Sequence, residues 1–401
     1  MADFEEISFQ NPHWFGKNET EKKKRRLFGA LVKGLDNRFI CSLQGIRRVG
    51  KTTLLRQIMH YLVSEKKVKP ERILYFSFDD APHEPRQVVH TWASRFGIDL
   101  HSPGVYVFFD EIQKVGRWGE KLKVLYDNTK IKFFLSGSSS LLLSKGNESL
   151  AGREFSYELP PFAFDEWMEF CGLPKEAATW ELYEKYLFSQ FPQIAQGEVE
   201  CGDYVRSIID KVIEHDIPKA FGIGYSDRLK AIFQAMLKQP GQMIEYNDIA
   251  KDFGISRDTA SKYFHALENS FLLRKVENAL PNARKSEKAL KKYYPYVSSL
   301  TSAILPYPVD FALIVESDAA FELGARYFFN ERGKEIDFIV GKKLDIGVEV
   351  KMRARIDKSD VKCLLGRPLR ERYVVVKPET KLNVMGVKPI LPMNLWRLKL
   401  S

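Results

Sequence analysis

Apolar residues follow two spacings in the first part of the chain. A helix is predicted over residues 53–63, where apolar side chains recur three and four positions apart. Short apolar runs predict buried strands at residues 38–44, 72–78, 105–109 and 131–135. The first strand and the helix are joined by a loop, so residues 38–63 are expected to fold as a strand–loop–helix unit.

The loop between this strand and this helix has the glycine and lysine spacing of a phosphate-binding loop. Residues 45–53 read Gly-Ile-Arg-Arg-Val-Gly-Lys-Thr-Thr. Glycines let the backbone wrap a phosphate, and the helix N-terminus adds partial positive charge. We expect ATP here, with Lys51 at the β- and γ-phosphates and Thr52 holding Mg²⁺. The expected nucleotide-contacting residues are Gly45, Arg48, Val49, Gly50, Lys51, Thr52 and Thr53.

Two later strands end in polar residues that would face the same nucleotide. Residues 105–109 are apolar and are followed by Asp110 and Glu111. Asp110 would bind Mg²⁺ through its water shell, and Glu111 would act as general base on the attacking water. Ser136, at the tip of the next strand, would sense the γ-phosphate, with Ser138 as the reserve candidate. A Glu directly after the Asp favours hydrolysis over binding alone.

Two basic features allow alternative roles. Arg153 would either stabilise charge on the transferred phosphoryl group, as an arginine finger does, or form a plain salt bridge. If it acts on a neighbouring subunit, the protein would be a homo-oligomer. The run at residues 21–26, Glu-Lys-Lys-Lys-Arg-Arg, is typical of a solvated helix face, and a DNA contact is its alternative role.

A helix-turn-helix pattern lies at residues 243–269. Gly254 supplies a left-handed turn between the two helices, and Ser256 caps the second one. In such modules the second helix enters the major groove of DNA. The expected DNA contacts are Arg257, Ser261 and Lys262. A wing strand is expected over 271–278, and the basic surface would extend through Lys285, Lys288, Lys291 and Lys292.

Acidic residues and a lysine recur near the C-terminus with strand-like flanks. Glu349 and Lys351 lie two positions apart, so a strand would put both side chains on one face. Asp337 and Glu349 would share a Mg²⁺, and Lys351 would activate water at a scissile phosphate. Glu316, on a preceding helix, would complete the metal shell, with Glu322 as its rival. The alternative is a fold that packs or binds DNA without cutting it.

Composition narrows the class of protein. The net charge is +10 with a pI near 9.1, which fits a nucleic acid partner or ordinary surface basicity. Four widely separated cysteines without a CxxC pair suit a reducing cytoplasm and argue against zinc. The apolar runs are too short to span a bilayer, and the N-terminal residues lack a signal-peptide pattern. We therefore expect a cytoplasmic protein without a membrane segment.

Four motifs in order carry a family resemblance, namely GIRRVGKTTLL, FFDEIQ, LSGSSS, and LAGR followed by PFAFDE. They resemble the prokaryotic AAA+-superfamily ATPases, in particular the branch with a winged helix and a PD-(D/E)XK restriction-endonuclease-like domain in its C-terminal half. The resemblance implies an α/β fold divided into a polar arm, P-loop AAA+ core, helical lid, winged helix-turn-helix and nuclease-like α/β domain. The implied boundaries are 1–28, 29–165, 166–236, 237–290 and 291–401.

Together, the residues and the resemblance predict a Mg²⁺-dependent ATPase that binds duplex or branched DNA. It would act on branched or broken DNA. Metal-dependent nuclease activity is left open. The alternative is a regulatory nucleotide switch that has a protein partner and a catalytically silent nuclease fold.

Overall fold

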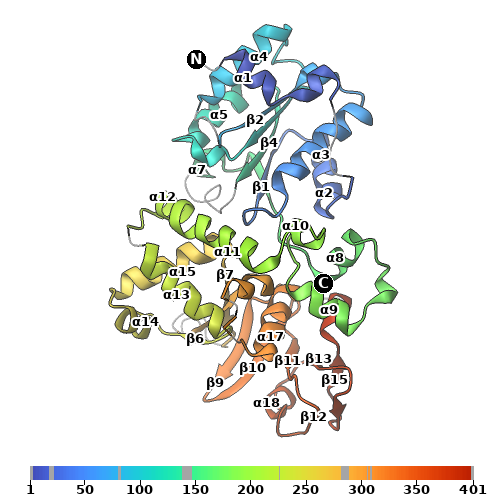
Figure 1. Ribbon diagram of the computed structural model, residues 1–401, viewed down its shortest axis with the longest axis vertical. Helices are drawn as coiled ribbons and strands as arrows, with labels where there is room; N and C mark the ends of the chain where they lie inside the picture. Colours follow the sequence, from blue (N-terminus) through green and yellow to red (C-terminus); the bar gives the residue numbers. More distant parts are fainter. Residues whose placement is uncertain are drawn as a thin grey trace. The chain divides into compact units, whose positions relative to one another are not determined.

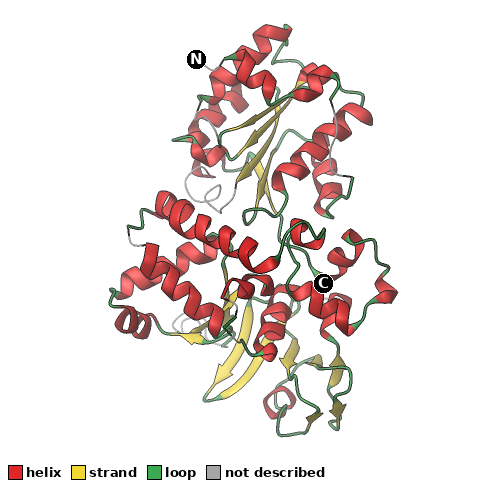
Figure 2. Ribbon diagram, viewed as in Figure 1, coloured by secondary structure: helices red, strands yellow, loops and turns green. Residues whose placement is uncertain are grey.

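The computed structural model describes residues 3–17, 22–79, 83–137, 147–224, 226–280, 289–304, 306–307 and 309–398. The chain divides into two compact units, Met1–Pro160 and Pro161–Ser401. Each unit has its own main sheet (Figures 1 and 2). The predicted Ser138, Lys285 and Lys288 lie outside the described residues.

A parallel sheet with helices on both faces forms the first unit. Over the described residues its strand order is β2-β3-β4-β1-β5. The strands are β1 (Ile40–Gln44), β2 (Ile73–Ser77), β3 (Tyr106–Asp110), β4 (Lys132–Gly137) and β5 (Glu154–Glu158). The helices are α1 (Phe4–Phe9), α2 (Leu27–Lys33), α3 (Lys51–Ser64), α4 (Pro85–Phe96), α5 (Trp118–Asn128) and α7 (Asn147–Leu150). Helices α2 and α3 lie on one face of the sheet, and α1, α4 and α5 lie on the other (Figure 1).

Strands β1 to β4 are mostly apolar because both faces of the sheet are covered there, whereas the edge strand β5 is polar and largely exposed. Every residue of β1 and β4 is buried. Phe76, Phe109 and Phe133, from three neighbouring strands, share a core with Trp92 of α4 and Leu122 of α5. Strands covered on both sides read as continuous apolar runs rather than alternating ones. This explains why the apolar runs of the sequence locate the strands.

The edge strand β2 is closed by side chains of the N-terminal arm. The Asn11 amide donates to the Tyr75 carbonyl at 2.8 Å and accepts from the Tyr75 N–H at 2.7 Å. The Trp14 indole donates to the Ile73 carbonyl at 2.8 Å. Unpaired backbone groups on a sheet edge invite pairing with another chain, so these contacts protect the edge. The arm is thus part of the folded unit.

Most of the helices in the second unit come before its main sheet. They are α8 (Phe164–Phe170), α9 (Trp180–Leu187), α10 (Pro192–Ala195), α11 (Cys201–Lys211), α12 (Ile217–Phe221) and α13 (Ser226–Lys238), with a π-helical turn over Val212–Asp216. The region expected as a helical lid, 166–236, is therefore helical, and it clusters with the C-terminal part of the chain. The division into five domains stays a prediction.

Next along the chain is a helix–turn–helix. It consists of α14 (Tyr246–Phe253) and α15 (Arg257–Asn269). Gly254 ends α14 with φ 61°, the left-handed conformation that glycine adopts without strain. The Ser256 hydroxyl accepts from the Thr259 N–H at 3.1 Å and caps α15. Local sequence signals therefore set both helix boundaries at this turn.

One continuous sheet joins the strands around this helix pair to the C-terminal strands. Over the described residues its order is β15-β13-β11-β10-β9-β7-β8-β6. The strands are β6 (Met243–Ile244), β7 (Leu273–Asn278), β8 (Lys291–Pro295), β9 (Tyr327–Glu331), β10 (Lys334–Val340), β11 (Ile346–Val350), β13 (Glu371–Val375) and β15 (Lys388–Ile390). β12 (Arg355–Ile356) pairs separately with β14 (Lys381–Leu382). The expected boundary at 290/291 thus falls inside a sheet, because β8 pairs with β7 and β6.

Helix α17 (Phe311–Glu322) is fastened to the preceding helices by a buried acidic network. The Tyr183 hydroxyl of α9 donates to Asp318 at 2.7 Å. Glu322 accepts from the Tyr186 hydroxyl at 2.7 Å and from the Phe164 N–H at 2.6 Å. Burial raises the pKa of Asp318 to about 7 and that of Glu322 to about 8.

The raised pKa of Glu322 predicts a pH-dependent stability. The folded state holds this proton more tightly than the unfolded chain, so the free energy of unfolding falls as pH rises from about 4 to about 8. Glu322→Gln lacks this titrating group. Between about pH 4 and about pH 8, its free energy of unfolding should therefore rise relative to that of wild type by about 1 kcal/mol per pH unit. Urea unfolding at several pH values checks this. Glu181→Gln, on an exposed part of α9, is the control, and parallel wild-type and Glu322→Gln curves would contradict the prediction.

Candidate functional site

The P-loop joins β1 to α3 and depends on its two glycines. Gly45 has φ 154°, and a Cβ there would lie 2.3 Å from the Leu159 carbonyl oxygen, so only glycine fits. Gly50 has φ 99° and directly precedes α3. The Lys51 ammonium donates to the carbonyls of Gly45 at 2.8 Å and Ile46 at 3.0 Å. The loop therefore curls around the lysine that is expected to meet phosphate.

Arg25 braces the P-loop from the N-terminal arm. Its guanidinium donates to the Val49 carbonyl at 3.0 Å and to the Pro160 carbonyl at 2.7 Å. The Gln57 amide of α3 donates to the Lys23 carbonyl at 3.0 Å. Arg25 is 6% exposed, so the expectation of a solvated run is wrong for this residue, whereas Lys22, Lys23, Lys24 and Arg26 are exposed. A run of like charges gives no signal of which member is buried.

Asp110 is where the predicted ATP-site residues meet. Its carboxylate accepts from the Thr52 hydroxyl at 2.6 Å and from the Ser136 hydroxyl. It also accepts from the Tyr75 hydroxyl of β2 at 2.8 Å. Parallel pairing of β2, β3 and β4 brings these side chains to one edge of the sheet. Sequence reasoning missed Tyr75, because within an apolar strand its ring reads as core.

Glu111 directly follows β3 in a left-handed backbone conformation, with φ 53°. The Gln113 amide donates to its carboxylate. Burial raises the pKa of the Glu111 carboxyl, and the Lys51 ammonium opposes that rise. A raised pKa makes a carboxylate a stronger proton acceptor, which suits a general base. Glu111 is thus a candidate base whose charge interacts with that of the P-loop lysine.

Arg153 lies at the end of the strands opposite to the P-loop. Its carbonyl accepts from the N–H of Ile40, the first residue of β1, whereas the P-loop follows the last residue. A strand of this length separates its two ends by roughly 16 Å. The guanidinium forms an ion pair with Asp127 at 3.0 Å. This ion pair is the plain salt bridge given as the alternative role, and an arginine-finger role stays a prediction. A role toward a neighbouring subunit stays a prediction.

The three expected DNA contacts lie along α15, with mixed charge around them. The Arg257 side chain is 62% exposed, but the neighbouring Asp258 is more exposed, at 96%. Ser261 is half-buried, and the exposed Lys262 donates to the Gly222 carbonyl at 3.4 Å. Arg257 and Lys262 are therefore exposed cations of α15, with the acidic Asp258 beside the first of them.

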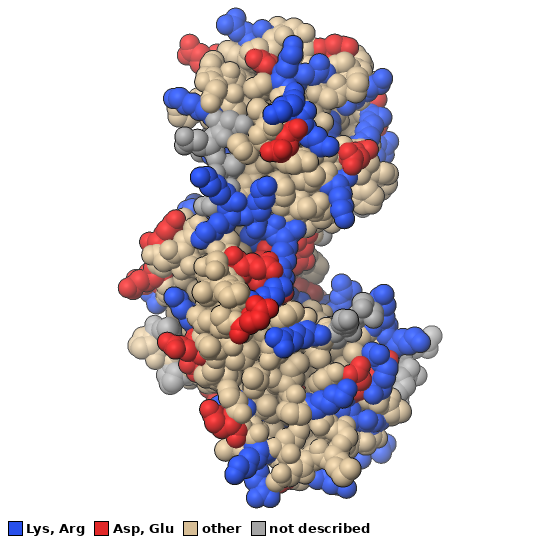
Figure 3. All heavy atoms as spheres, turned by 90° about the vertical axis from the view of Figure 1, so that its right-hand side faces the viewer, with Lys and Arg blue, Asp and Glu red and all other residues tan. Residues whose placement is uncertain are grey.

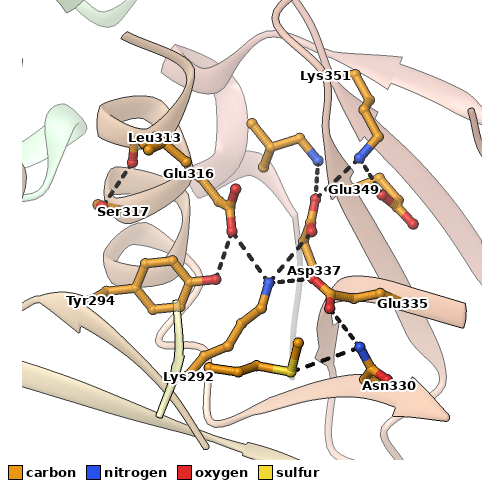
Figure 4. A network of polar contacts seen from close by, with 12 residues as sticks. Lys292, Tyr294, Leu313, Glu316, Ser317, Asn330, Glu335, Asp337, Glu349 and Lys351 are labelled. Carbon is orange, nitrogen blue, oxygen red and sulfur yellow. Dashed lines mark hydrogen bonds and ion pairs between the residues drawn. The ribbon is translucent and has the colours of Figure 1, made fainter. Parts of the chain in front are cut away.

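The four C-terminal site residues meet in one cluster, as Figure 4 shows. Glu316 comes from α17, Asp337 from β10 and Glu349 from β11, with Lys351 just beyond β11. The Lys351 ammonium lies 2.8 Å from Glu349 and 3.7 Å from Asp337. Burial and the Asp337 charge raise the pKa of Glu316 to about 7 and that of Glu349 to about 8. Glu322, the rival of Glu316, belongs to the separate network with Tyr186.

A second lysine, Lys292 of β8, enters this cluster. Its ammonium lies 2.5 Å from Glu335, 3.6 Å from Glu316 and 3.8 Å from Asp337. Lys292 is 5% exposed, so its assignment to a basic surface was wrong. Among the residues that the structure describes, no three His, Cys, Asp or Glu side chains are grouped to hold a metal ion. The role of Glu316, Asp337 and Glu349 as metal ligands stays a prediction.

In the described parts of the chain, no helix combines the length and the apolar character needed to cross a membrane. The four cysteines are free thiols: Cys41, Cys171, Cys201 and Cys363.

The chain is 26% identical over 276 residues to an uncharacterized protein of Methanocaldococcus jannaschii, covering 60% of this chain and 57% of that relative's length. It is 26% identical over 334 residues to an uncharacterized protein of Haemophilus influenzae, covering 79% of this chain and 83% of the relative. Neither name assigns an activity.

Solved structures give partial likenesses. The ORC2 protein of Aeropyrum pernix, solved as ADPNP–ADP complexes, has a TM-score of 0.42 and 14% identity, covering 78% of this chain and 98% of that one. RuvB of Thermotoga maritima has a TM-score of 0.31 and 20% identity, covering 62% of this chain and 85% of that one.

Family models match two parts of the chain. Residues 179–308 match a domain of unknown function. Residues 37–168 match the model of an AAA domain, which begins just before β1 and includes the P-loop and Asp110. The parallel sheet, the strand–loop–helix turn at Gly45–Lys51 and this match together identify residues 37–168 as an AAA domain with a P-loop.

Proposed function

We propose that this protein hydrolyses ATP with Mg²⁺ at the edge of the first sheet where β1 and β3 end. The observation that carries the proposal is the convergence of Thr52, Ser136 and Tyr75 on Asp110 beside the P-loop. A hydroxyl and a carboxylate are hard oxygen ligands of the kind that Mg²⁺ prefers. Thr52 and Asp110 would hold the ion, which would supply charge neutralisation for the phosphates.

The residues of the chain divide the remaining work. Backbone N–H groups of the P-loop would receive phosphate oxygens, and the Lys51 ammonium would bind the β- and γ-phosphates. Glu111 would orient a water molecule in line with the γ-phosphate and accept its proton. Ser136 would contact the γ-phosphate from the tip of β4. Positioning and charge provide most of the rate enhancement in such reactions.

Replacing the proposed base tests this function. Glu111→Gln should lower the ATP hydrolysis rate by at least about 100-fold, because an amide cannot accept the water proton. ATP binding should persist, since Gly45–Thr53 remains intact. Phosphate release and equilibrium binding of a fluorescent ATP analogue measure the two effects. Glu65→Gln, at the exposed end of α3, should behave as wild type. Normal turnover by Glu111→Gln, or no turnover by wild type with Mg²⁺, would contradict the proposal.

The Tyr75 hydroxyl gives a second prediction. Tyr75→Phe keeps the buried ring but removes one donor from Asp110, so the carboxylate would be held less firmly. We expect the Mg²⁺ concentration for half-maximal ATPase activity to rise by about tenfold, in line with the loss of one hydrogen bond to a charged group, about 1.5 kcal/mol. Tyr106→Phe, at the other end of β3, is the matched control. Identical Mg²⁺ titrations of the two variants would contradict a positioning role.

We also propose that the second unit binds DNA, duplex or branched, through α15. Support comes from the helix–turn–helix geometry, the exposure of Arg257 and the net charge of +10. On the face drawn in Figure 3, Lys and Arg side chains are spread widely, with Asp and Glu among them. The proposed mode is contact of Arg257 and Lys262, the two exposed cations of α15, with phosphates.

Removing both cations from α15 tests the DNA proposal. Arg257→Ala/Lys262→Ala should weaken duplex and four-way-junction binding about tenfold at low salt. The log–log salt slope should fall by about two, because two phosphate contacts are lost. Lys66→Ala/Arg86→Ala removes two exposed cations of the first unit and serves as the charge-matched control. Equal losses in both double variants, or no wild-type binding at low salt, would contradict the proposal.

The alternative function is a regulatory nucleotide switch with a protein partner and a nuclease-like fold that does not cut. The position of Lys292 among the C-terminal carboxylates favours the non-cutting part of this alternative. The free cysteines suit the reducing cytoplasm that the sequence predicts for either function.

A further inference from the structure

Lys292 lies deep within the C-terminal carboxylate cluster. Its side chain is 6% exposed, and its ammonium lies 5.5 Å from the centre of the Phe328 ring. The ammonium is within 4 Å of carboxylates from α17 and β10, two of the three elements that would supply metal ligands. A buried cation is tolerated when it is paired with carboxylates, and three of them surround this one.

The ammonium lies between two of the three carboxylates that would hold a shared metal ion, Glu316 and Asp337. Figure 4 shows the Lys292 nitrogen between Glu316 and Asp337. Mg²⁺ needs direct oxygen ligands at about 2.1 Å in nearly octahedral geometry. An ammonium among the same oxygens would repel the ion and occupy its volume. Asp337 also accepts the Val350 N–H at 2.8 Å and faces Lys351, so its second oxygen is engaged.

We propose that the Lys292 ammonium is the resident cation of this cluster, in place of a divalent metal. The side chain joins β8, which pairs with the strands next to the helix–turn–helix, to α17 and β10 of the C-terminal part. The cluster is then a set of ion pairs through which β8 holds α17 and β10 in place. The nuclease-like fold of the second unit does not cut DNA with this lysine in place. This inference does not depend on ATP hydrolysis or on DNA contacts by α15.

The tyrosine beside Lys292 supports this arrangement. The Tyr294 hydroxyl of β8 donates to Glu316 at 2.7 Å. The same strand therefore presents both a cation and a hydrogen-bond donor to this carboxylate. Two contacts from β8 fix Glu316 toward the strand, which fits a structural joint.

Calorimetric titration with Mn²⁺ tests the proposal. The nucleotide-free full chain carries Asp110→Asn, so that the ATP site contributes little binding. With Lys292 present, we expect no Mn²⁺ binding that depends on Asp337. Adding Lys292→Met, which keeps the length of the stem but removes the charge, should create one site per chain, at least tenfold tighter than any background. Lys292→Arg retains a cation and should not create the site.

Asp337→Asn assigns any bound Mn²⁺ to the cluster. The site gained with Lys292→Met should disappear when Asp337→Asn is added. The proposal is overturned if the chain with Lys292 binds Mn²⁺ and Asp337→Asn abolishes that binding. It is also overturned if folded Lys292→Met gains no site. If Lys292→Met does not fold, the test uses the chain that keeps Lys292. Mn²⁺ binding by this chain is then compared with and without Asp337→Asn.

A plasmid assay provides an independent readout. Supercoiled DNA incubated with the wild-type chain and Mn²⁺ should remain intact. Nicking by wild type that is lost in Lys351→Ala would overturn the proposal, because it would show a working metal-dependent site.

Discussion

The first unit depends on a single buried carboxylate, that of Asp110. Three hydroxyl groups donate to it: Thr52 from the first turn of α3, Tyr75 from β2 and Ser136 from β4. Asp110 is 2% exposed, and a buried carboxylate is costly unless it is fully hydrogen-bonded. The P-loop helix is thereby linked to both strands that flank β3. A movement of Asp110 around a nucleotide would change its hydrogen bonds to Tyr75 of β2 and Ser136 of β4.

The second unit is organised by acids on opposite faces of one helix. Asp318 and Glu322 are four positions apart on α17 and meet tyrosines of α9, whereas Glu316 turns toward Lys292 and Tyr294 of β8. Residues four apart share a helix face, and residues two apart do not. On one side of α17, tyrosine hydroxyls of α9 donate to Asp318 and Glu322, whose pKa values are raised. On the other side, the Lys292 ammonium pairs with the helix.

Continuity of the larger sheet limits what this unit can do. β7 pairs with β8 on one side and with β9 on the other, so the strands beside the helix–turn–helix and the C-terminal strands form one ladder. Separating them would break backbone hydrogen bonds and the contacts of Lys292 together.

The sequence by itself determined the features that depend on short spacing. The P-loop, the acids after β3, the turn at Gly254 and the Glu349–Lys351 pair are local patterns, and each occurs where the pattern predicts. Local backbone geometry needs only neighbouring residues, so it can be read without knowing the fold.

Only the tertiary structure decided which polar side chains are buried and what they contact. Arg25 and Lys292 stand in basic runs that read as surface, and Tyr75 stands in an apolar strand that reads as core. Their partners lie far away in the sequence, at Val49, Glu316 and Asp110. The motif around Arg153 predicted a role at the ATP site. Parallel pairing of β1 and β5 puts this residue beside the start of β1, whereas the P-loop follows the end of β1. Strand order and register fix such contacts, and no local spacing encodes them.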